Sequence, residues 1–450
     1  MYPFIAKLLA ASILVASWLP LVALASTSSS ESSPSADAQS ASAGEEPKRP
    51  SEAASSENQA PKELELNQDE YNEILKALGQ TDASASVSTP VFTASSSTVP
   101  ALSVAQTQST MNPAIALIFD VALAYFSDED PLQTGAHDPT ATGFTLQQLE
   151  LHAESKVDQH FDLQANLVFS QYGVEIEELY AQTLSLPYSL QLRAGQYLLP
   201  FGRINQTHPH TWSFVDQALS VGTFLGGEGG RGLGIETSWL LPLPWYSKLT
   251  ASVNQNAGEC CAKSFVTGAP PKVEGLNDLL YTARLEQFYE LSDNWSVLAG
   301  LSYLLGENQT GRDNQSHIRA VDFFVKYKPI TSTDRFYVSM QLEWFQRDRQ
   351  VPGRNFKSQT GYVELKSGLN PYWEIAARTE WLGKFQAKRL DDALEGERYR
   401  HTGQVTYRPS HFSRLRLQLS QDRPQWREDP IWSSMLALEV LVGAHGAHTY

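Results

Sequence analysis

The residues best suited to chemistry gather in one long connection between two apolar segments, residues 199–231. Histidines, carboxylates and arginines stand there beside glycines at 226, 227, 229 and 230, which permit sharp bends. Folded into a pore, such a connection forms an eyelet that screens solutes by size and charge. The alternative is an ordinary surface loop or a contact between subunits. The candidate eyelet residues are Arg203, His208, His210, Asp216, Glu228 and Arg231.

A second group of charges recurs at alternate positions toward the C-terminus. If the apolar faces of these segments point outward, the arginines share the inner face of three consecutive strands and form a basic wall. Acidic residues of other segments face the same interior, so a transverse field across a pore is one interpretation. Pairing of charges between neighbouring strands is the other, and both stay open. The arginines are Arg378, Arg398, Arg400, Arg408, Arg414 and Arg416, and the acids are Asp120, Glu150, Glu154, Asp162, Glu178 and Glu236.

Metal binding and catalysis are not predicted. The run His208-Pro209-His210 is not a metal-ligand spacing, and only the fold could bring His137 or the Cys260-Cys261 pair to it. Motifs for a nucleophile, paired carboxylates or a phosphate loop do not stand out, so we expect no enzyme, no metal and no cofactor. The formal net charge of −16 argues against nucleic-acid binding.

From Asn112 onward, apolar and polar residues alternate with a period of two, which is typical of strands. The connections alternate as well: those on one side hold six residues or fewer, whereas those on the other mostly exceed ten, with 171–174 a short exception. An even number of strands with such connections is typical of bacterial transmembrane barrels. We predict an all-β, closed antiparallel barrel of about 16 strands over 112–450, with its long third outer connection folded inward. The predicted strands are 115–126, 144–157, 161–170, 175–184, 188–198, 232–240, 245–254, 278–289, 294–305, 317–328, 335–347, 358–368, 371–383, 398–408, 411–421 and 432–442.

Aromatic residues mark the ends of two of these strands. Trp295 and Tyr303 share one face of the first, and Trp373 and Trp381 share one face of the second. Eight residues of tilted strand span about 25 Å, the height of the apolar band of an outer-membrane barrel. We therefore predict that these four residues belong to the two aromatic girdles at the membrane surfaces.

The N-terminal quarter of the chain differs in composition. Residues 1–25 hold an apolar run ending in Ala23-Leu24-Ala25, which is typical of a cleaved secretory signal peptide. Residues 26–111 are rich in Ser, Ala, Thr, Glu and Pro, which predicts a disordered periplasmic segment. Within it, 62–79 has apolar residues at helical spacing, so it forms either an amphipathic helix or a transient one in a linker.

Three runs resemble known families. Residues 195–202, GQYLLPFG, are similar to a strand-to-turn segment of the phosphate-selective porins O and P. GRINQTHPHTWSFVDQ and GAHGAH resemble a group labelled zinc-regulated TonB-dependent outer-membrane receptors. A terminal aromatic such as Tyr450 resembles the recognition signal of the barrel-assembly machinery.

The resemblance implies a Gram-negative outer-membrane channel, commonly trimeric, for passive diffusion of small polar or charged solutes. The region before Asn112 is too short and too low in complexity for a plug domain, and the barrel region is acidic. Gated receptor transport and phosphate selectivity are therefore not expected to carry over. An outer-membrane receptor or a substrate-specific channel for a metal or metal chelate is the alternative function.

Overall fold

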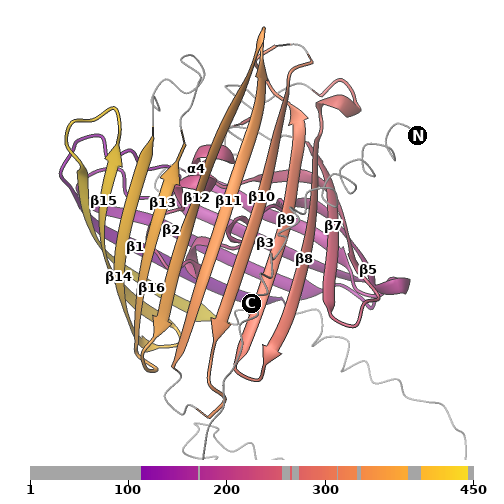
Figure 1. Ribbon diagram of the computed structural model, residues 1–450. Helices are drawn as coiled ribbons and strands as arrows, with labels where there is room; N and C mark the ends of the chain where they lie inside the picture. The colour runs from indigo at the N-terminus through magenta and orange to yellow at the C-terminus, as the bar shows by residue number, and fades with distance from the viewer. Residues whose placement is uncertain are drawn as a thin grey trace, which may run out of the picture. The chain divides into compact units, whose positions relative to one another are not determined.

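The computed structural model describes residues 113–170, 173–255, 264–265, 273–311, 313–331, 336–383 and 397–443. Within these residues, 16 strands form one closed antiparallel barrel, in which every strand pairs with its neighbours along the chain and β1 pairs with β16 (Figure 1). The strands are β1 Ala114–Phe126, β2 Gly143–Lys156, β3 Phe161–Ser170, β4 Gly173–Thr183, β5 Leu190–Leu198, β6 Arg231–Leu240, β7 Tyr246–Gln255, β8 Leu280–Ser292, β9 Trp295–Glu307, β10 Gln315–Tyr327, β11 Tyr337–Val351, β12 Arg354–Gly368, β13 Trp373–Leu382, β14 Arg398–Ser410, β15 Ser413–Pro424 and β16 Ile431–Gly443.

The predicted fold class and strand order are confirmed. The strand ends agree with the predicted segments to within three residues except around one connection, where β11 runs on to Val351 and β12 begins at Arg354. The predicted strand ends at 347 and 358 were therefore wrong, and the connection is shorter than expected. Pro352 and Gly353 alone join the two strands, because Gly353 adopts a φ of +76° that suits a tight hairpin turn. The polar and charged residues on both sides of this turn are of the kind expected in a loop, although they belong to β11 and β12.

Apolar side chains cover the outside of the barrel and polar side chains fill its inside. On β16, Leu436, Leu438, Val440 and Val442 are 41–61% exposed, whereas Glu439 between them is buried. A soluble barrel shows the opposite pattern, since water favours polar outer faces. An apolar outer face is what a lipid bilayer requires of a spanning barrel.

Two of the four predicted girdle residues have exposed rings. Trp295 and Trp373 pack against Tyr327 and Tyr407 on the next strand, with ring centroids 4.8 Å apart in each pair. Tyr303 differs from the expectation of an exposed ring, because it is buried and its hydroxyl lies 2.7 Å from Nδ1 of His317. Trp381 is partly buried. Exposed rings at the opposite ends of other strands include Tyr125, Tyr399 and Trp432.

Three predictions lie outside the described residues: the signal peptide 1–25, the segment 26–111 with its helix 62–79, and the terminal residues up to Tyr450. The Cys260-Cys261 pair lies outside them as well. In the described part of the chain, no helix is long and apolar enough to cross a membrane.

A lipid-facing side chain provides a test of the outer face. Leu417, near the middle of β15, is 48% exposed and lies beside Val405 and Leu436 on the neighbouring strands. We expect Leu417→Arg to lower the free energy of unfolding in phospholipid vesicles by about 2–4 kcal/mol, because a guanidinium at the bilayer midplane is poorly solvated. The matched control is Leu291→Arg at the end of β8, where the change falls to about 0–1 kcal/mol. Equal changes in the two variants would contradict a lipid-facing β15.

Candidate functional site

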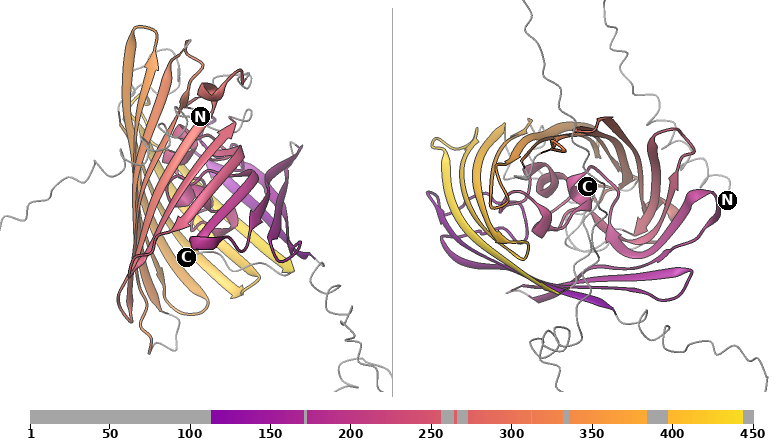
Figure 2. Two further views of the ribbon diagram at one scale, coloured as in Figure 1. Left: turned by 90° about the vertical axis from the view of Figure 1, so that its right-hand side faces the viewer. Right: turned by 90° about the horizontal axis from the view of Figure 1, so that it is seen from below.

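The connection between β5 and β6, residues 199–230, lies inside the ring of strands, and we call it the inner segment (Figure 2). It contains two short 3-10 turns, η2 Ile204–Gln206 and η3 Pro209–Thr211, and one helix, α4 Leu219–Phe224. All six residues of α4 are buried. Helix α4 contacts β11, β12 and β13, which form the wall of the barrel in front of it in Figure 1.

A cluster of apolar side chains packs the inner segment against the wall of the barrel. Phe201 meets the ring of Phe345 on β11 edge-on, with centroids 5.3 Å apart, and Phe224 of α4 lies 6.5 Å from the same ring. Burial of such rings is among the larger stabilising contributions in a protein. This apolar packing positions the segment against the wall, whereas polar side chains satisfy its backbone groups. The other members of the cluster are Leu199, Ile204, Ala218, Val221, Leu225, Phe265, Leu280, Leu304, Ile318, Ala320 and Tyr362.

A buried carboxylate on β11 receives the start of the inner segment. The backbone N–H groups of Arg203 and Ile204 donate to the two oxygens of Glu343, at 3.1 and 2.8 Å. Gly202 makes this approach possible, since its φ is +63° and a Cβ there would lie 2.5 Å from Oε2 of Glu343. The hydroxyl of Tyr362 donates to the same carboxylate at 2.7 Å. Glu343 therefore acts as an acceptor for a sharp turn of the chain.

A second buried carboxylate, Asp216 of the inner segment, is held by three neighbouring strands of the wall, β13, β14 and β15. Arg378 on β13 donates to Oδ1 at 2.7 Å, Arg400 on β14 donates to Oδ2 at 2.9 Å, and Gln418 on β15 donates to Oδ1 at 2.9 Å. Burial alone would raise the pKa of Asp216, but the two guanidinium groups lower it below its ordinary value. The carboxylate therefore stays ionised and joins three strands to the segment.

The remaining wall arginines also make buried contacts. Arg414 donates to the carbonyl oxygens of His210 and Trp212, at 2.7 and 2.9 Å, and Arg416 donates to that of Phe214 at 3.0 Å. These are backbone groups that no regular element satisfies, and burying them unpaired would be unfavourable. Acidic partners complete the network: Arg398 pairs with Asp422, Arg400 with Asp422, Arg408 with Glu374, Arg414 with Glu439, and Arg416 with Asp120. This geometry matches the alternative in which lumen charges are paired.

The first outer connection closes over the end of the inner segment. Asp138 accepts the N–H of Gln217 at 2.9 Å, and the Nε2 atom of His137 lies 3.1 Å from Oε2 of Glu228. Burial opposes the charged form of His137, but its hydrogen bond with Glu228 and the charge of that residue raise the pKa to about 9. Burial, together with the charge of Asp216, raises the pKa of Asp138 to about 6.

Two histidines of the inner segment contact glutamates on β2 and β4. The Nδ1 atom of His208 lies 2.9 Å from Oε2 of Glu177, and its Nε2 atom lies 3.0 Å from Oε2 of Glu178. His210 is stacked on His208, with ring centroids 5.6 Å apart, and its Nδ1 lies 2.8 Å from Oε2 of Glu150. Burial opposes the charge on His208, but the glutamates raise its pKa well above the ordinary value.

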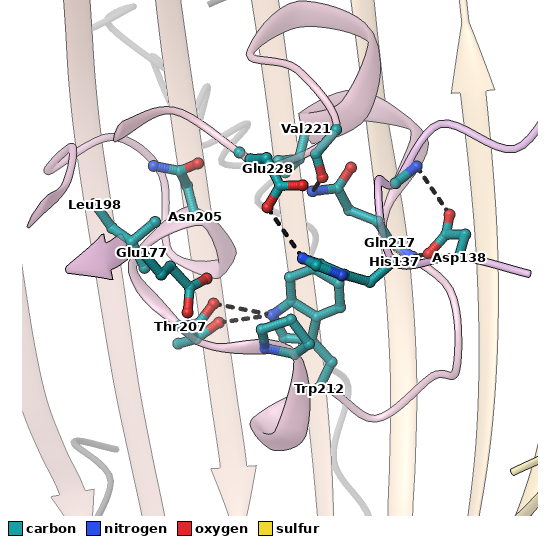
Figure 3. A pocket seen from close by; sticks show the side chains of 14 residues that line it. His137, Asp138, Glu177, Leu198, Asn205, Thr207, Trp212, Gln217, Val221 and Glu228 are labelled. Atoms are coloured by element: carbon teal, nitrogen blue, oxygen red, sulfur yellow. Dashed lines mark hydrogen bonds and ion pairs between the residues drawn. The ribbon is translucent and has the colours of Figure 1, made fainter. Parts of the chain in front are cut away.

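A pocket opens between the first outer connection and the inner segment, beside this cluster. Figure 3 shows the hydrogen-bonded pair of His137 and Glu228 on its upper side, with Thr207 and Trp212 on the lower side. The Trp212 ring nitrogen donates to both the carbonyl and the hydroxyl of Thr207, each at 3.1 Å, which fixes the indole. Glu177 lines the pocket, so the pocket gives access to the glutamate cluster.

The structure distributes the six candidate eyelet residues among different contacts. Asp216 joins the arginine network, His208 and His210 join the glutamate cluster, Glu228 pairs with His137, and Arg231 pairs with Glu175 at 2.8 Å. Arg203 is partly exposed and stacks over the ring of Phe324 at 4.2 Å. The sequence did not indicate Glu343, Gln418, Asp138 or Glu177, because each acts through a contact distant in the chain. Glu343 and Gln418 had only an inward position on a predicted strand as a signal, and Asp138 and Glu177 lacked even that.

A closed barrel of 16 antiparallel strands with an apolar outer face is the fold of the outer-membrane porins. Two solved structures share it: the outer membrane channel DcaP of Acinetobacter baumannii, at 13% identity over 74% of this chain and 96% of that one, with a TM-score of 0.50; and OprB of Pseudomonas putida, at 10% identity over 75% and 95%, also with a TM-score of 0.50. At these identities the similarity concerns the fold alone.

A closer relative comes from Aquifex aeolicus. An uncharacterized protein of that organism is 30% identical over 338 residues, which cover 68% of this chain and 70% of the relative. The chain belongs to the same family as this protein. No model of a described family matches the chain. The narrower resemblance to the phosphate-selective porins O and P, and to the zinc-regulated receptors, stays a prediction.

The Asp216 anchor can be tested by replacing its charge. We expect Asp216→Asn to leave two buried guanidinium groups short of a partner and to cost about 3 kcal/mol. In the folded barrel, this loss should appear as faster cleavage of the inner segment by a protease added in detergent. The matched control is Asp348→Asn, which removes a carboxylate paired with Arg319 on the outward side of β10 and β11. Equal protection of Asp216→Asn and the native chain would contradict the anchor.

The contact between His137 and Glu228 predicts a dependence on pH. A histidine whose pKa rises from 6.5 to about 9 on folding stabilises the folded state fully below pH 6.5, and this contribution is lost as the pH rises through 9. At about 1.4 kcal/mol per pKa unit, the loss is at most about 3 kcal/mol. Urea unfolding at pH 7 and pH 10 should therefore show a larger decrease for the native chain than for His137→Gln. His160→Gln, in an exposed turn, should behave like the native chain.

Proposed function

We propose that this protein is an outer-membrane channel through which small polar or charged solutes diffuse passively, and that the inner segment sets its narrowest part. The observation that carries the proposal is the anchoring of residues 199–230 inside a closed barrel from two sides. Glu150 on β2 and Glu178 on β4 contact its histidines, whereas Glu343 on β11 and Arg378 on β13 hold it from the other side. An internal segment fixed on both sides narrows a lumen permanently, whereas a loose loop would block it intermittently. A fixed constriction is the device by which porin-type barrels screen solutes.

The distribution of side chains supports this function. The outer face is apolar and the inner face is polar, which suits a barrel with lipid outside and water-soluble material inside. The solved structure from Acinetobacter baumannii is described as an outer membrane channel, and the present chain covers 96% of it. We place the protein in the outer membrane of a Gram-negative bacterium, with its N-terminal segment in the periplasm and a homotrimer as the assembly. Transport, not catalysis, is the role proposed.

In this proposal, few residues can select solutes by their charge. Five of the six wall arginines are buried in ion pairs, and the partly exposed Arg408 is paired with Glu374, so the wall offers little free charge to a passing solute. Arg203 is different, because it belongs to the inner segment, stays partly exposed, and is held in place by Phe324 and by a hydrogen bond of 3.2 Å to Gln341. We propose Arg203 as the charge that solutes meet. Selectivity for phosphate, which would need several free cations together, is not proposed.

Removal of the inner segment tests the function. Leu198 and Arg231 are direct partners in the ladder of β5 and β6, so a four-residue Gly-Ser turn can replace residues 199–230 without altering the strands. The native protein should give steady conductance steps in planar lipid bilayers. The shortened protein should give steps several-fold larger, because the narrowest part of the path is gone.

The control is a protein shortened in another outer connection, residues 425–430 between β15 and β16. In that connection Arg427 pairs with Asp128 and Asp130 at the surface. Its conductance should equal that of the native protein. Silence of both the native and the shortened barrel would contradict a channel. Equal steps in the two would leave a channel but remove the inner segment as its constriction.

A further inference from the structure

We propose that Glu150, Glu177 and His208 form a binding site for a divalent transition-metal cation, with Zn²⁺ as the preferred ion by ligand type. One ligand atom of each residue lies within 4.8 Å of the others. Glu150 belongs to β2, Glu177 to β4 and His208 to the inner segment, so an ion here joins two strands to the segment. One imidazole and two carboxylates are a ligand set that Zn²⁺ accepts, with further positions open to water.

A β-bulge brings Glu177 into this cluster. The ladder between β3 and β4 pairs Asn166 with Glu178 and then Leu167 with Ile176, which leaves Glu177 without a partner residue. As a result, Glu177 and Glu178 are both buried on the inside although they are consecutive. A bulge breaks a strand's alternation and re-aims a side chain, and bulges are common beside functional sites. Here the extra inward side chain is the carboxylate that His208 faces.

A buried oxygen without a partner points to a missing ligand. Glu150 is 1% exposed, and its Oε2 lies 2.8 Å from His210, but its Oε1 has no hydrogen-bond partner among the described residues. A buried carboxylate oxygen is unfavourable when unpaired. A divalent cation bound in the cluster would satisfy this oxygen.

Glu178 contacts the second nitrogen of the His208 ring. Its Oε2 lies 3.0 Å from Nε2 of His208, on the side of the ring away from Glu177, and its Oε1 accepts the backbone N–H of Leu198 at 2.9 Å. The amide nitrogen of Asn166 lies 2.9 Å from the same ring nitrogen. Metal-binding histidines commonly donate their second N–H to such a carboxylate, which orients the ring and strengthens the ligand. Nδ1 of His208 is then the metal-facing atom.

The ligand spacing requires a small rearrangement. Ligands at about 2.0–2.2 Å from a tetrahedral zinc lie roughly 3.3–3.6 Å apart, which is closer than the 4.8 Å limit of the cluster. Glutamate side chains reach this spacing by turning about their terminal bonds. The pocket lined by Glu177, Thr207 and Trp212 gives an ion a route to the site.

Titration calorimetry with ZnCl₂ tests the site on the full-length folded protein in detergent, without any histidine tag. We expect one Zn²⁺ per chain, and at least about tenfold weaker binding for His208→Gln and for Glu177→Gln, since each removes one ligand. The matched control is Glu175→Gln on the same strand, which removes an acid paired with Arg231 and should keep native affinity. Absence of binding, or equal weakening in all three variants, would overturn the proposal.

Two further measurements distinguish this site from thiolate binding and from misfolding of a variant. The Cys260-Cys261 pair is an alternative ligand source, so Co²⁺ is added in place of Zn²⁺; its spectrum should lack thiolate charge-transfer bands, and their presence would overturn the site. Retarded migration of unheated samples in gels verifies that each variant is folded, and Glu150→Gln replaces a variant that is not. Binding is measured without transport, so its outcome is independent of whether the barrel conducts.

Discussion

The interior of this barrel depends on the buried contact between Asp216 and the guanidinium groups of Arg378 and Arg400. A 32-residue stretch without long regular elements carries many backbone groups into buried positions, and each of these groups needs a partner. The wall supplies them from charged side chains, which reach farther than backbone groups. Because those side chains are themselves charged, they need counter-ions, and Asp216, Asp422 and Glu439 provide them. The segment and the wall therefore supply each other with hydrogen-bond partners and counter-ions.

Much of this architecture follows from the period of a strand. Alternation alone identified the strands and their order, because a barrel in lipid has opposite polarity on its two faces along its whole height. The same alternation put Arg378, Arg400 and Arg416 on the inside, where they are buried. What it left open was the state of these arginines, since free and paired charges have the same spacing. That choice depends on Asp216, whose partners are strands far along the chain.

The parts that could not be predicted share one cause, a local departure from regular pairing. Glu177 is turned inward by a bulge, and strict alternation would have placed it outside beside an inward Glu178. Pro352-Gly353 closes a hairpin among charged residues that resemble a loop. Glu343 accepts two N–H groups only because Gly202 takes up a left-handed conformation. In each case one residue changes the direction of a side chain or of the backbone, and residue type alone does not reveal it.

The separation of the anchors along the chain has a consequence for assembly. Asp216 precedes its two arginine partners by 162 and 184 residues, and Phe214 precedes Arg416 by 202. Contacts of such long range form late, because the intervening chain must first be ordered. The inner segment is thus synthesised before β13, β14 and β15. Its carbonyl groups and Asp216 lack their arginine partners until these strands have been made. The contacts that hold the segment therefore come from strands late in the sequence, and a nascent chain halted after β12 would contain the segment without its arginines.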